Sequence, residues 1–285
     1  MRPLLAALLV PLALVACDED ANTASTGAAE RPDRFDSARA WKTLEYQVGL
    51  GERPAGSPAS RKLGRFLKRR VPNGRYQRVP GGLRNVIGRV PGRDPERVVL
   101  VGAHYDTKDI PGFVGANDGA SGTAVVLRLA REIKPRTIRP TLLFAFFDGE
   151  ESPRGTPDHE FEEEGLRGSR VGARRFAGRV DRMVLLDFVG DEDLSIPREA
   201  NSTRRLWSRP RAAARGAGAA ATFPDGTAGA ILDDHVPFLQ RGVPAIDLID
   251  FDFDCFHRTC DDLDAVSEDS LDRVGETMME LLPTL

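Results

Sequence analysis

Histidines and carboxylates recur where the apolar segments of this 285-residue chain end. His104 and Asp106 follow one apolar run. Glu150 and Glu151 follow the next, and Asp187 lies near the end of a third. Carboxylates that converge without a counter-charge repel one another, so we expect a cation between them. Oxygen and imidazole ligands together suit Zn²⁺, a Lewis acid that can work beside a carboxylate that moves protons.

Other residues at equivalent positions extend this set. Asp148 also follows the second apolar run, Asp118 opens the segment after the first, and His257 follows the fourth after a loop. The chain has only four histidines, and two of them fall at such positions. Chance explains a single acid at one segment end more readily than a full set drawn from separate segments.

Most of these residues also have a purely structural interpretation. Asp118 could be the N-cap of a following helix. Glu150 and Glu151 could form a solvated acidic turn, and His104 could be a hydrogen-bonded histidine at a strand end. Asp187 is harder to explain in this way, because a buried acid between Leu, Leu, Phe and Val needs a partner.

Asp106, the charge run at 158–164 and Asp233 are expected to lie around the site without binding the metal. Asp106 points the same way as His104 on an extended chain, and it is predicted to orient the imidazole without binding the metal. The charge run at 158–164 is predicted to be a solvated loop with His159 as a bystander. Asp233 precedes an apolar helix, where it either complements the helix N-terminus or lies at the edge of the pocket.

The segments that must position these residues alternate between helix and strand. Helices are predicted at 41–50, 59–70, 121–133, 169–177, 202–216, 237–241 and 267–282. Strands are predicted at 75–80, 83–90, 97–103, 141–147, 182–189 and 245–249. This alternation predicts a three-layer α/β/α fold with a mixed, mostly parallel central sheet. In open sheets of this kind, ligands bind beyond the carboxyl ends of the strands.

Composition excludes several other classes of protein. The chain is 41% hydrophobic, which rules out disorder over its whole length. Gly and Pro are scattered without a period, which rules out collagen-like repeats. No apolar run reaches the ~20 residues that a membrane-spanning helix needs. A net charge of −3, with basic residues interspersed among acids, argues against nucleic acid as a partner.

The N-terminal segment predicts export. Residues 1–17 combine a positive start with a short apolar core, as a signal peptide does. The letters LVAC at 14–17 resemble a bacterial lipobox, in which Cys17 carries the lipid; the alternative is an ordinary secretory signal. Residues 18–34 are small and polar and predict a flexible linker, followed by one catalytic domain at 35–285. We therefore expect a monomeric cell-envelope lipoprotein, attached to the membrane through its lipid anchor only.

Cysteine usage is consistent with export. With Cys17 assigned to lipid, Cys255 and Cys260 remain, and they flank His257. Thiols outside the cytoplasm tend to pair, so a disulfide that closes a small loop is predicted. Free buried thiols or metal ligands are the alternatives, and His257 could simply pack beside the bridge.

Several motifs together resemble a known family. They are GAHYDT, GANDGASG, FFDGEE, GLRGSR, MVLLDFVG, DDHVPFLQRGVPAI and the histidine of CFHRTCDD. The chain resembles the zinc-dependent aminopeptidase superfamily, and within it the glutaminyl cyclase branch. The resemblance runs from about Arg53 to the end of the chain.

The resemblance implies a set of site residues. In the cyclase type, one zinc ion is bound by Asp118, Glu151 and His257. Glu150 is the acid/base, and Asp187 and Asp233 belong to the catalytic hydrogen-bond network. In the two-zinc peptidase type, Asp118 bridges the metals, and the coordination spheres are completed by His104, Glu151, Asp187 and His257. Phe256 stands where animal cyclases commonly have a Trp that lines the glutamine pocket, so we expect it in the substrate pocket.

Three functions follow from this resemblance, the first two being enzymes that act on the N-termini of peptides or proteins. The first choice is a glutaminyl-peptide cyclotransferase with one zinc ion, which converts N-terminal Gln to pyroglutamate and releases ammonia. The alternative is an aminopeptidase with two zinc ions, in which Glu150 activates water for hydrolysis. A non-catalytic binding module is the third, but the presence of a residue at every ligand position argues against it.

Overall fold

The computed structural model describes residues 33–285. The predicted signal peptide, Cys17 and nearly all of the predicted linker lie outside these residues. Within the described part of the chain, no helix is both long enough and apolar enough to cross a membrane.

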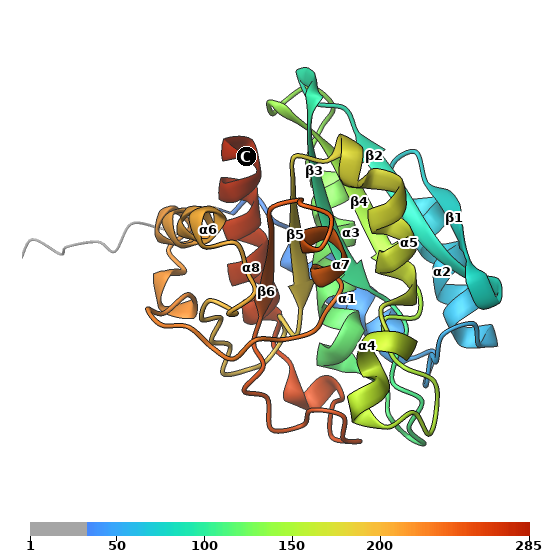
Figure 1. Ribbon diagram of the computed structural model, residues 1–285. Coiled ribbons are helices and arrows are strands. Elements are labelled where there is room, and N and C mark those ends of the chain that lie inside the picture. The colour runs from blue at the N-terminus through green and yellow to red at the C-terminus, as the bar shows by residue number, and fades with distance from the viewer. Residues whose placement is uncertain (1–32) are drawn as a thin grey trace, which may run out of the picture. The chain divides into compact units, whose positions relative to one another are not determined.

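The described residues form one mixed sheet of six strands (Figure 1). The strands are β1 (Arg75–Val79), β2 (Leu83–Val90), β3 (Asp94–His104), β4 (Pro140–Phe147), β5 (Arg182–Asp187) and β6 (Ala245–Ile249). Their spatial order is β1-β2-β4-β3-β5-β6. β2 is antiparallel to β1 and β4, whereas β4, β3, β5 and β6 are parallel. The predicted mixed, mostly parallel sheet is therefore confirmed.

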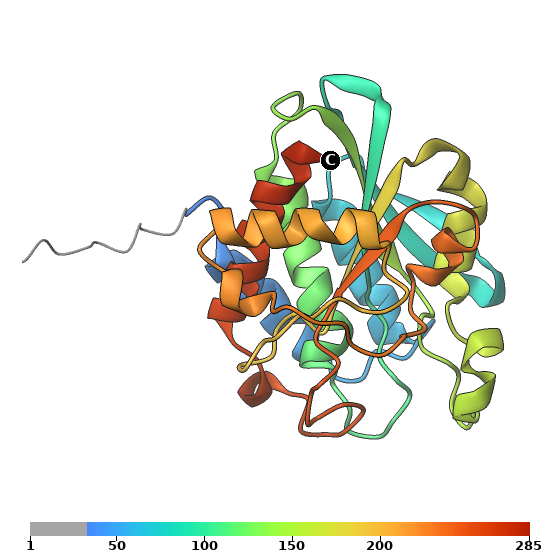
Figure 2. The same cartoon turned by 60° about the vertical axis from the view of Figure 1, so that its left-hand side comes forward.

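Helices cover both faces of this sheet. They are α1 (Ser37–Val48), α2 (Pro58–Arg70), α3 (Gly122–Glu132), α4 (Phe161–Glu164), α5 (Arg167–Phe176), α6 (Arg204–Gly216), α7 (Val236–Leu239) and α8 (Glu268–Leu281). One apolar core joins the sheet to α1, α2, α3, α6 and α8, and a second joins its other face to α5 and α7. Figure 2 brings the α6 and α8 side forward, where these two helices pack together.

Burial on two faces explains why the central strands read as continuous apolar runs. All eight residues of β4 are buried, because helices cover both of its sides. A strand that is solvated on one face would instead alternate apolar and polar residues. Parallel strands of this kind bring their carboxyl ends to one edge, where the candidate site residues follow them.

Element ends differ from the predicted ranges for local reasons. α1 begins four residues before the predicted range, because the side chain of Asp36 accepts a hydrogen bond from the Arg39 N–H and caps the helix. β5 ends at Asp187 and not at 189, because Phe188 has a left-handed φ of 45° that leaves the strand. The charge run predicted as a loop contains the short helix α4, although its acidic side chains are exposed as expected.

One glycine sets the distance between α3 and the sheet. A Cβ built on Gly122 would lie 2.1 Å from the carbonyl oxygen of Leu186 in β5. Only a residue without a side chain allows this close approach, which places the start of α3 directly beside the ends of the central strands.

We expect Gly122→Ala to lower the free energy of unfolding by about 1–3 kcal/mol, because the methyl group would push α3 away from β5. The measurement is equilibrium denaturation with urea. Gly178→Ala is the matched control, since a Cβ there would meet no atom of the described residues within 4 Å. Equal stability of the two variants would contradict this account of the helix–sheet contact.

Candidate active site

The carboxyl ends of four parallel strands bring the predicted site residues together. His104 ends β3, and Glu151 lies in the turn after β4. Asp187 ends β5, and the loop after β6 carries His257. Asp118 enters from the irregular turn Ala116–Ser121 that precedes α3. The structure therefore joins residues that are far apart in the sequence.

The first group of converging side chains is Asp118, Glu151 and His257. His257 Nε2 lies 3.2 Å from Glu151 Oε1 and 3.4 Å from Asp118 Oδ2. Asp118 and Glu151 are buried, whereas His257 is partly exposed toward the pocket. This group is the ligand set that the cyclase resemblance implies.

A second group shares Asp118 with the first. His104 Nε2 lies 3.2 Å from Asp118 Oδ1 and 3.2 Å from Asp187 Oδ1. The two oxygens of Asp118 therefore face two different imidazoles, which is the arrangement of a carboxylate that bridges two metal ions. The ligand atoms of each group lie within 4.8 Å of one another.

The residues present fit a zinc ion. Two ligands bound to tetrahedral zinc at about 2.0–2.1 Å are themselves about 3.3 Å apart, and the four distances above lie close to that value. Asp118 Oδ2 is buried and accepts no hydrogen bond from the described residues. A buried carboxylate oxygen without a donor is costly, and a bound cation would satisfy it.

Electrostatics in the first two groups favour charged side chains. Burial opposes ionisation of Asp118, but the nearby imidazoles of His104 and His257 hold its pKa well below its usual range. Burial likewise opposes protonation of His257, but Asp118 and Glu151 raise its pKa to about 9. The carboxylates thus attract positive charge to this point, which a metal ion would supply in place of protons.

Asp106 acts differently from the prediction. Its Oδ1 lies 3.8 Å from His104 Nδ1, which is too long for a hydrogen bond that would orient the imidazole. Instead, the carboxylate accepts backbone N–H groups from Gly149 (2.9 Å), Glu150 (3.3 Å) and Glu151 (3.3 Å). Asp106 therefore fixes the turn that carries Glu150 and Glu151. The position of Asp106 in the sequence gives no sign of these hydrogen bonds, because they join it to the turn after β4.

Glu150 lies in the pocket beside the first group, together with Asp187 and Asp233. Burial, followed by the charge of Glu151, raises the pKa of Glu150 well above its usual range. Burial also raises the pKa of Asp187 to about 7, although His104 opposes the shift. A raised pKa favours the protonated form of a carboxyl group, which suits both residues to acid/base chemistry.

The pocket has a volume of about 390 Å³ and an apolar rim. Phe188, Phe251 and Phe256 form an aromatic cluster in it, with ring centroids 4.9–6.2 Å apart. Phe256 also stacks on the His257 ring at 3.9 Å. Phe251 and Phe256 stay 45% and 36% exposed, which is unusual for large apolar side chains and leaves them free to contact a ligand.

The loop that presents His257 is closed by a disulfide between Cys255 and Cys260, as predicted. His257 has a left-handed φ of 52°, a backbone conformation that is uncommon for residues other than Gly. The closed loop holds this conformation and turns the imidazole toward Asp118 and Glu151. Simple packing beside the bridge is therefore not the role of His257 in this structure.

Three residues near the site were missed by the sequence analysis. Lys108 Nζ lies 3.1 Å from Glu151 Oε2. Asp261 accepts the N–H groups of Asn117 (2.6 Å) and Asp118 (3.1 Å). The buried Arg53 guanidinium donates to the carbonyl oxygens of Val114 and Gly115, just before Asp118. The signals that could have drawn attention to them are their places in the sequence. Lys108 directly follows GAHYDT, Asp261 lies within CFHRTCDD, and Arg53 begins the segment that carries the resemblance.

The structural alternatives for the acids are also resolved. Asp118 is not a helix N-cap, because α3 starts after Ser121 and the Asp118 side chain faces the two imidazoles. Asp233 does not cap α7, whose N-cap is His235, and it lines the pocket instead. Asp148 turns away from the pocket, and its carboxylate accepts the Arg84 N–H (2.8 Å).

Part of the charge run at 158–164 is solvated, and part of it contacts the pocket. Its His159 side chain is 81% exposed, as the prediction of a solvated segment requires. Asp158 and Phe161, however, line the pocket and form part of its wall. The apolar Phe161 within the acidic run is the signal that could have indicated this contact.

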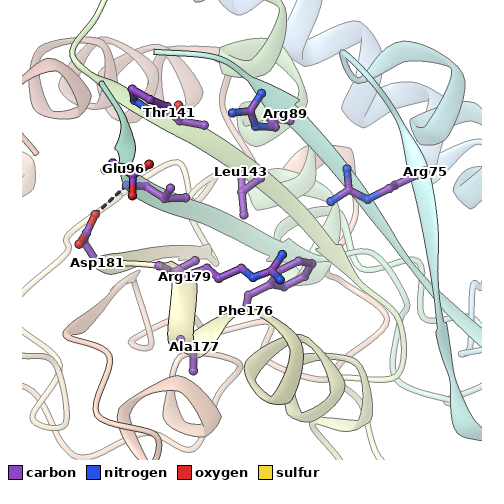
Figure 3. A pocket seen from close by; sticks show the side chains of 13 residues that line it. Arg75, Arg89, Glu96, Thr141, Leu143, Phe176, Ala177, Arg179 and Asp181 are labelled. Carbon is purple, nitrogen blue, oxygen red and sulfur yellow. Dashed lines mark hydrogen bonds between the residues drawn. The ribbon is translucent and has the colours of Figure 1, made fainter. Parts of the chain in front are cut away.

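A larger cavity of about 610 Å³ lies at the opposite end of the parallel strands (Figure 3). Arg75, Arg89 and Arg179 surround it, and Leu143 and Phe176 provide apolar walls. The figure shows Asp181 at its margin, where the carboxylate accepts the Val98 N–H (2.7 Å). Because this lining brings no histidine and no group of converging carboxylates, the smaller pocket is the candidate active site.

Comparisons with known proteins show which family and which solved structures the chain resembles. Residues 85–282 match the sequence model of peptidase family M28. A glutaminyl-peptide cyclotransferase of Drosophila melanogaster is 32% identical over 202 residues, which are 59% of this chain and 55% of that protein's length. The chain thus spans just over half of this relative.

Two crystal structures are similar over nearly their whole length. A glutaminyl cyclase from an Acidobacteriales bacterium is 30% identical with a TM-score of 0.76, over 90% of this chain and 96% of that one. A leucine aminopeptidase precursor from Bacteroides thetaiotaomicron is 25% identical with a TM-score of 0.80, over 90% and 99%. The fold and the cyclase-like character of the chain are therefore shown, and both reactions occur among the names of its relatives.

Asp261 offers a test of how the loop around Asp118 is held. In Asp261→Asn, the amide N–H₂ group would replace one acceptor oxygen and face a backbone N–H. We expect zinc affinity to fall about 10–100-fold, as is typical when the partner of a metal-binding segment is lost. The zinc dissociation constant is measured by competition with a chromophoric chelator.

The neighbouring Asp262 provides the control. Its side chain accepts the Asp264 N–H and caps the short helical turn Leu263–Ala265, so Asp262→Asn should leave zinc affinity unchanged. Equal losses in the two variants would refute the positioning role of Asp261.

Proposed function

Because this chain belongs to peptidase family M28, we propose that it is a zinc-dependent glutaminyl-peptide cyclotransferase, which converts the N-terminal Gln of peptides to pyroglutamate and releases ammonia. The observation that carries the proposal is the buried carboxyl of Glu150 in one pocket with Asp118, Glu151 and His257. The similarity to glutaminyl cyclases supports this reaction over others of the family.

Asp118, Glu151 and His257 would hold the zinc ion. When bound, zinc supplies Lewis-acid polarisation of the γ-carbonyl group of the substrate glutamine. The Lys108 ammonium stays near the second oxygen of Glu151 and leaves the first to face His257.

Glu150 would move the proton in both halves of the reaction. The α-amine nitrogen of the substrate attacks the γ-carbonyl carbon, and Glu150 accepts the proton that this nitrogen loses. The bond between that carbon and the amide nitrogen then breaks, and Glu150 returns the proton to the departing nitrogen, which leaves as ammonia. A carboxyl group whose pKa lies well above its usual range is suited to both transfers.

Asp187 and Asp233 would orient the groups that react. Both carboxyls line the pocket with Glu150, and the charge of Asp233 contributes to the raised pKa values of Asp187 and Glu150. Such carboxyls can accept hydrogen bonds from the α-amine and from the amide nitrogen of the substrate. They are acceptors that favour a substrate with an N-terminal amine.

The pocket walls suit the remainder of a peptide N-terminus. Phe251 and Phe256 offer apolar surface at the rim, where the methylene groups of glutamine can pack. Phe256 would then contact the substrate, as its position in the sequence implies.

An aminopeptidase is the second candidate, and the second group of ligands favours it. His104, Asp118 and Asp187 could hold a second zinc ion, and the leucine aminopeptidase precursor shares the fold. In that reaction Glu150 would activate a water molecule for attack on the scissile carbonyl. Two zinc ions and the release of a free amino acid would identify it.

We further propose that the protein acts in the cell envelope as a monomer on a lipid anchor. Residues 1–17 and Cys17 support this location through their sequence pattern alone. Mass spectrometry of the protein isolated from membranes tests it by detecting a diacylated Cys17.

The reaction is tested by incubating the full-length protein and zinc with a peptide that begins with Gln. A cyclase removes only ammonia, so the mass of the peptide falls by the mass of ammonia and no free amino acid appears. A peptidase releases free Gln, which would contradict the first proposal. The same peptide beginning with Leu separates the two further, because only the peptidase can act on it.

Glu150→Gln is expected to reduce kcat by about 10²–10⁴-fold while zinc stays bound, because the amide can neither accept nor return the proton. Zinc content is measured by elemental analysis beside the kinetic assay. Glu163→Gln in α4 is the control, since its exposed side chain should not affect the rate. Full activity of Glu150→Gln would refute the acid/base assignment.

A further inference from the structure

A third cluster of ionisable side chains lies beside the pocket and outside the two zinc groups. It consists of Glu199, Asp233, His235 and Asp247, none of which is more than 2% exposed. Asp233 and His235 precede α7, Asp247 lies within β6, and Glu199 precedes α6. Only Asp233 lines the pocket, so the cluster extends from the pocket wall into the protein interior.

Glu199 is held in place by backbone donors. Its carboxylate accepts the backbone N–H groups of Asn201 (2.7 Å), Ser202 (2.7 Å) and Ile231 (2.9 Å). These three hydrogen bonds fix the carboxylate at the position that faces the imidazole of His235.

The two ring nitrogens of His235 face different carboxylates. Nε2 lies 3.2 Å from Glu199 Oε2, and Nδ1 lies 3.6 Å from Asp247 Oδ2. With the proton on Nε2, Nδ1 would offer its lone pair on the side of Asp247. A carboxylate behind the outer nitrogen is the usual setting of a histidine that binds a metal.

The atoms that face Nδ1 are all acceptors. Among the described residues, Asp233 Oδ2, both oxygens of Asp247 and His235 Nδ1 find no hydrogen-bond partner. Ligand atoms of Asp233, His235 and Asp247 lie within 4.8 Å of one another. Buried acceptors that face each other are strongly unfavourable unless a proton or a metal cation lies between them.

We propose that Asp233, His235 and Asp247 bind a divalent transition-metal ion, separate from the active-site metal. One imidazole nitrogen and carboxylate oxygens are the ligand set of Zn²⁺ in proteins. The ion would tie the segment before α7 to β6 and hold Asp233 in the pocket wall. This site does not depend on which reaction the enzyme performs.

The test compares the zinc content of full-length variants by inductively coupled plasma mass spectrometry after dialysis against metal-free buffer. Asp247→Asn should contain about one zinc ion fewer per chain than the wild type, because a neutral amide is a poor ligand. Asp250→Asn, in the segment directly after β6, is the control and should match the wild type. Since the result is a difference, it holds whether the active site takes one ion or two.

A second measurement covers the case in which Asp247→Asn does not fold. Asp118→Asn removes the carboxylate that both active-site groups share, and this variant should still retain about one tightly bound ion. Adding His235→Gln to it should release that ion, which loading with Co²⁺ would show as the loss of visible absorption bands. Equal zinc content in Asp247→Asn and the wild type, or an Asp118→Asn protein that binds no metal, would overturn the proposal.

Discussion

The repulsion among buried carboxylates is the constraint on which the structure of this site depends. Six carboxyl groups line one pocket of about 390 Å³, together with a single ammonium group, that of Lys108, and the imidazole of His257. Parallel strands bring these acids to one edge, because each loop that follows a strand carries its own carboxylate to the same place. Such a concentration of negative charge is stable only when protons or a metal ion compensate it. The same excess of negative charge would attract the protonated N-terminus of a peptide.

Other buried carboxyl groups around the site hold the acidic loops in place. Asp106 accepts the N–H groups of the turn at Glu150, and Asp261 accepts those of the turn at Asp118. Glu199 does the same for the segment beside His235. In each case backbone donors satisfy a buried carboxyl group, which holds a neighbouring candidate ligand in place without belonging to the ligand set itself. The supporting residues are thus of the same chemical type as the residues they support.

The sequence predicted much of the fold and of the site, and what it missed has physical causes. Apolar runs located the four parallel strands, and the acids and histidines after these runs, among them His104, Glu151 and Asp187, lie close together in the structure because strand ends converge in a parallel sheet. Helix and strand ends were less accurate, since they depend on a cap at Asp36 or a left-handed φ at Phe188. The contacts of Asp106, Lys108 and Asp261 could not be predicted, because they depend on how loops fold back on one another.

In the proposed function, the choice between cyclisation and hydrolysis would depend on whether the shared Asp118 holds one metal ion or two. The most direct measurement is an anomalous difference map, collected at the zinc absorption edge from crystals of the zinc-loaded protein. The account predicts a peak within ligand distance of Asp118, Glu151 and His257. An active protein with no peak at this position would contradict it.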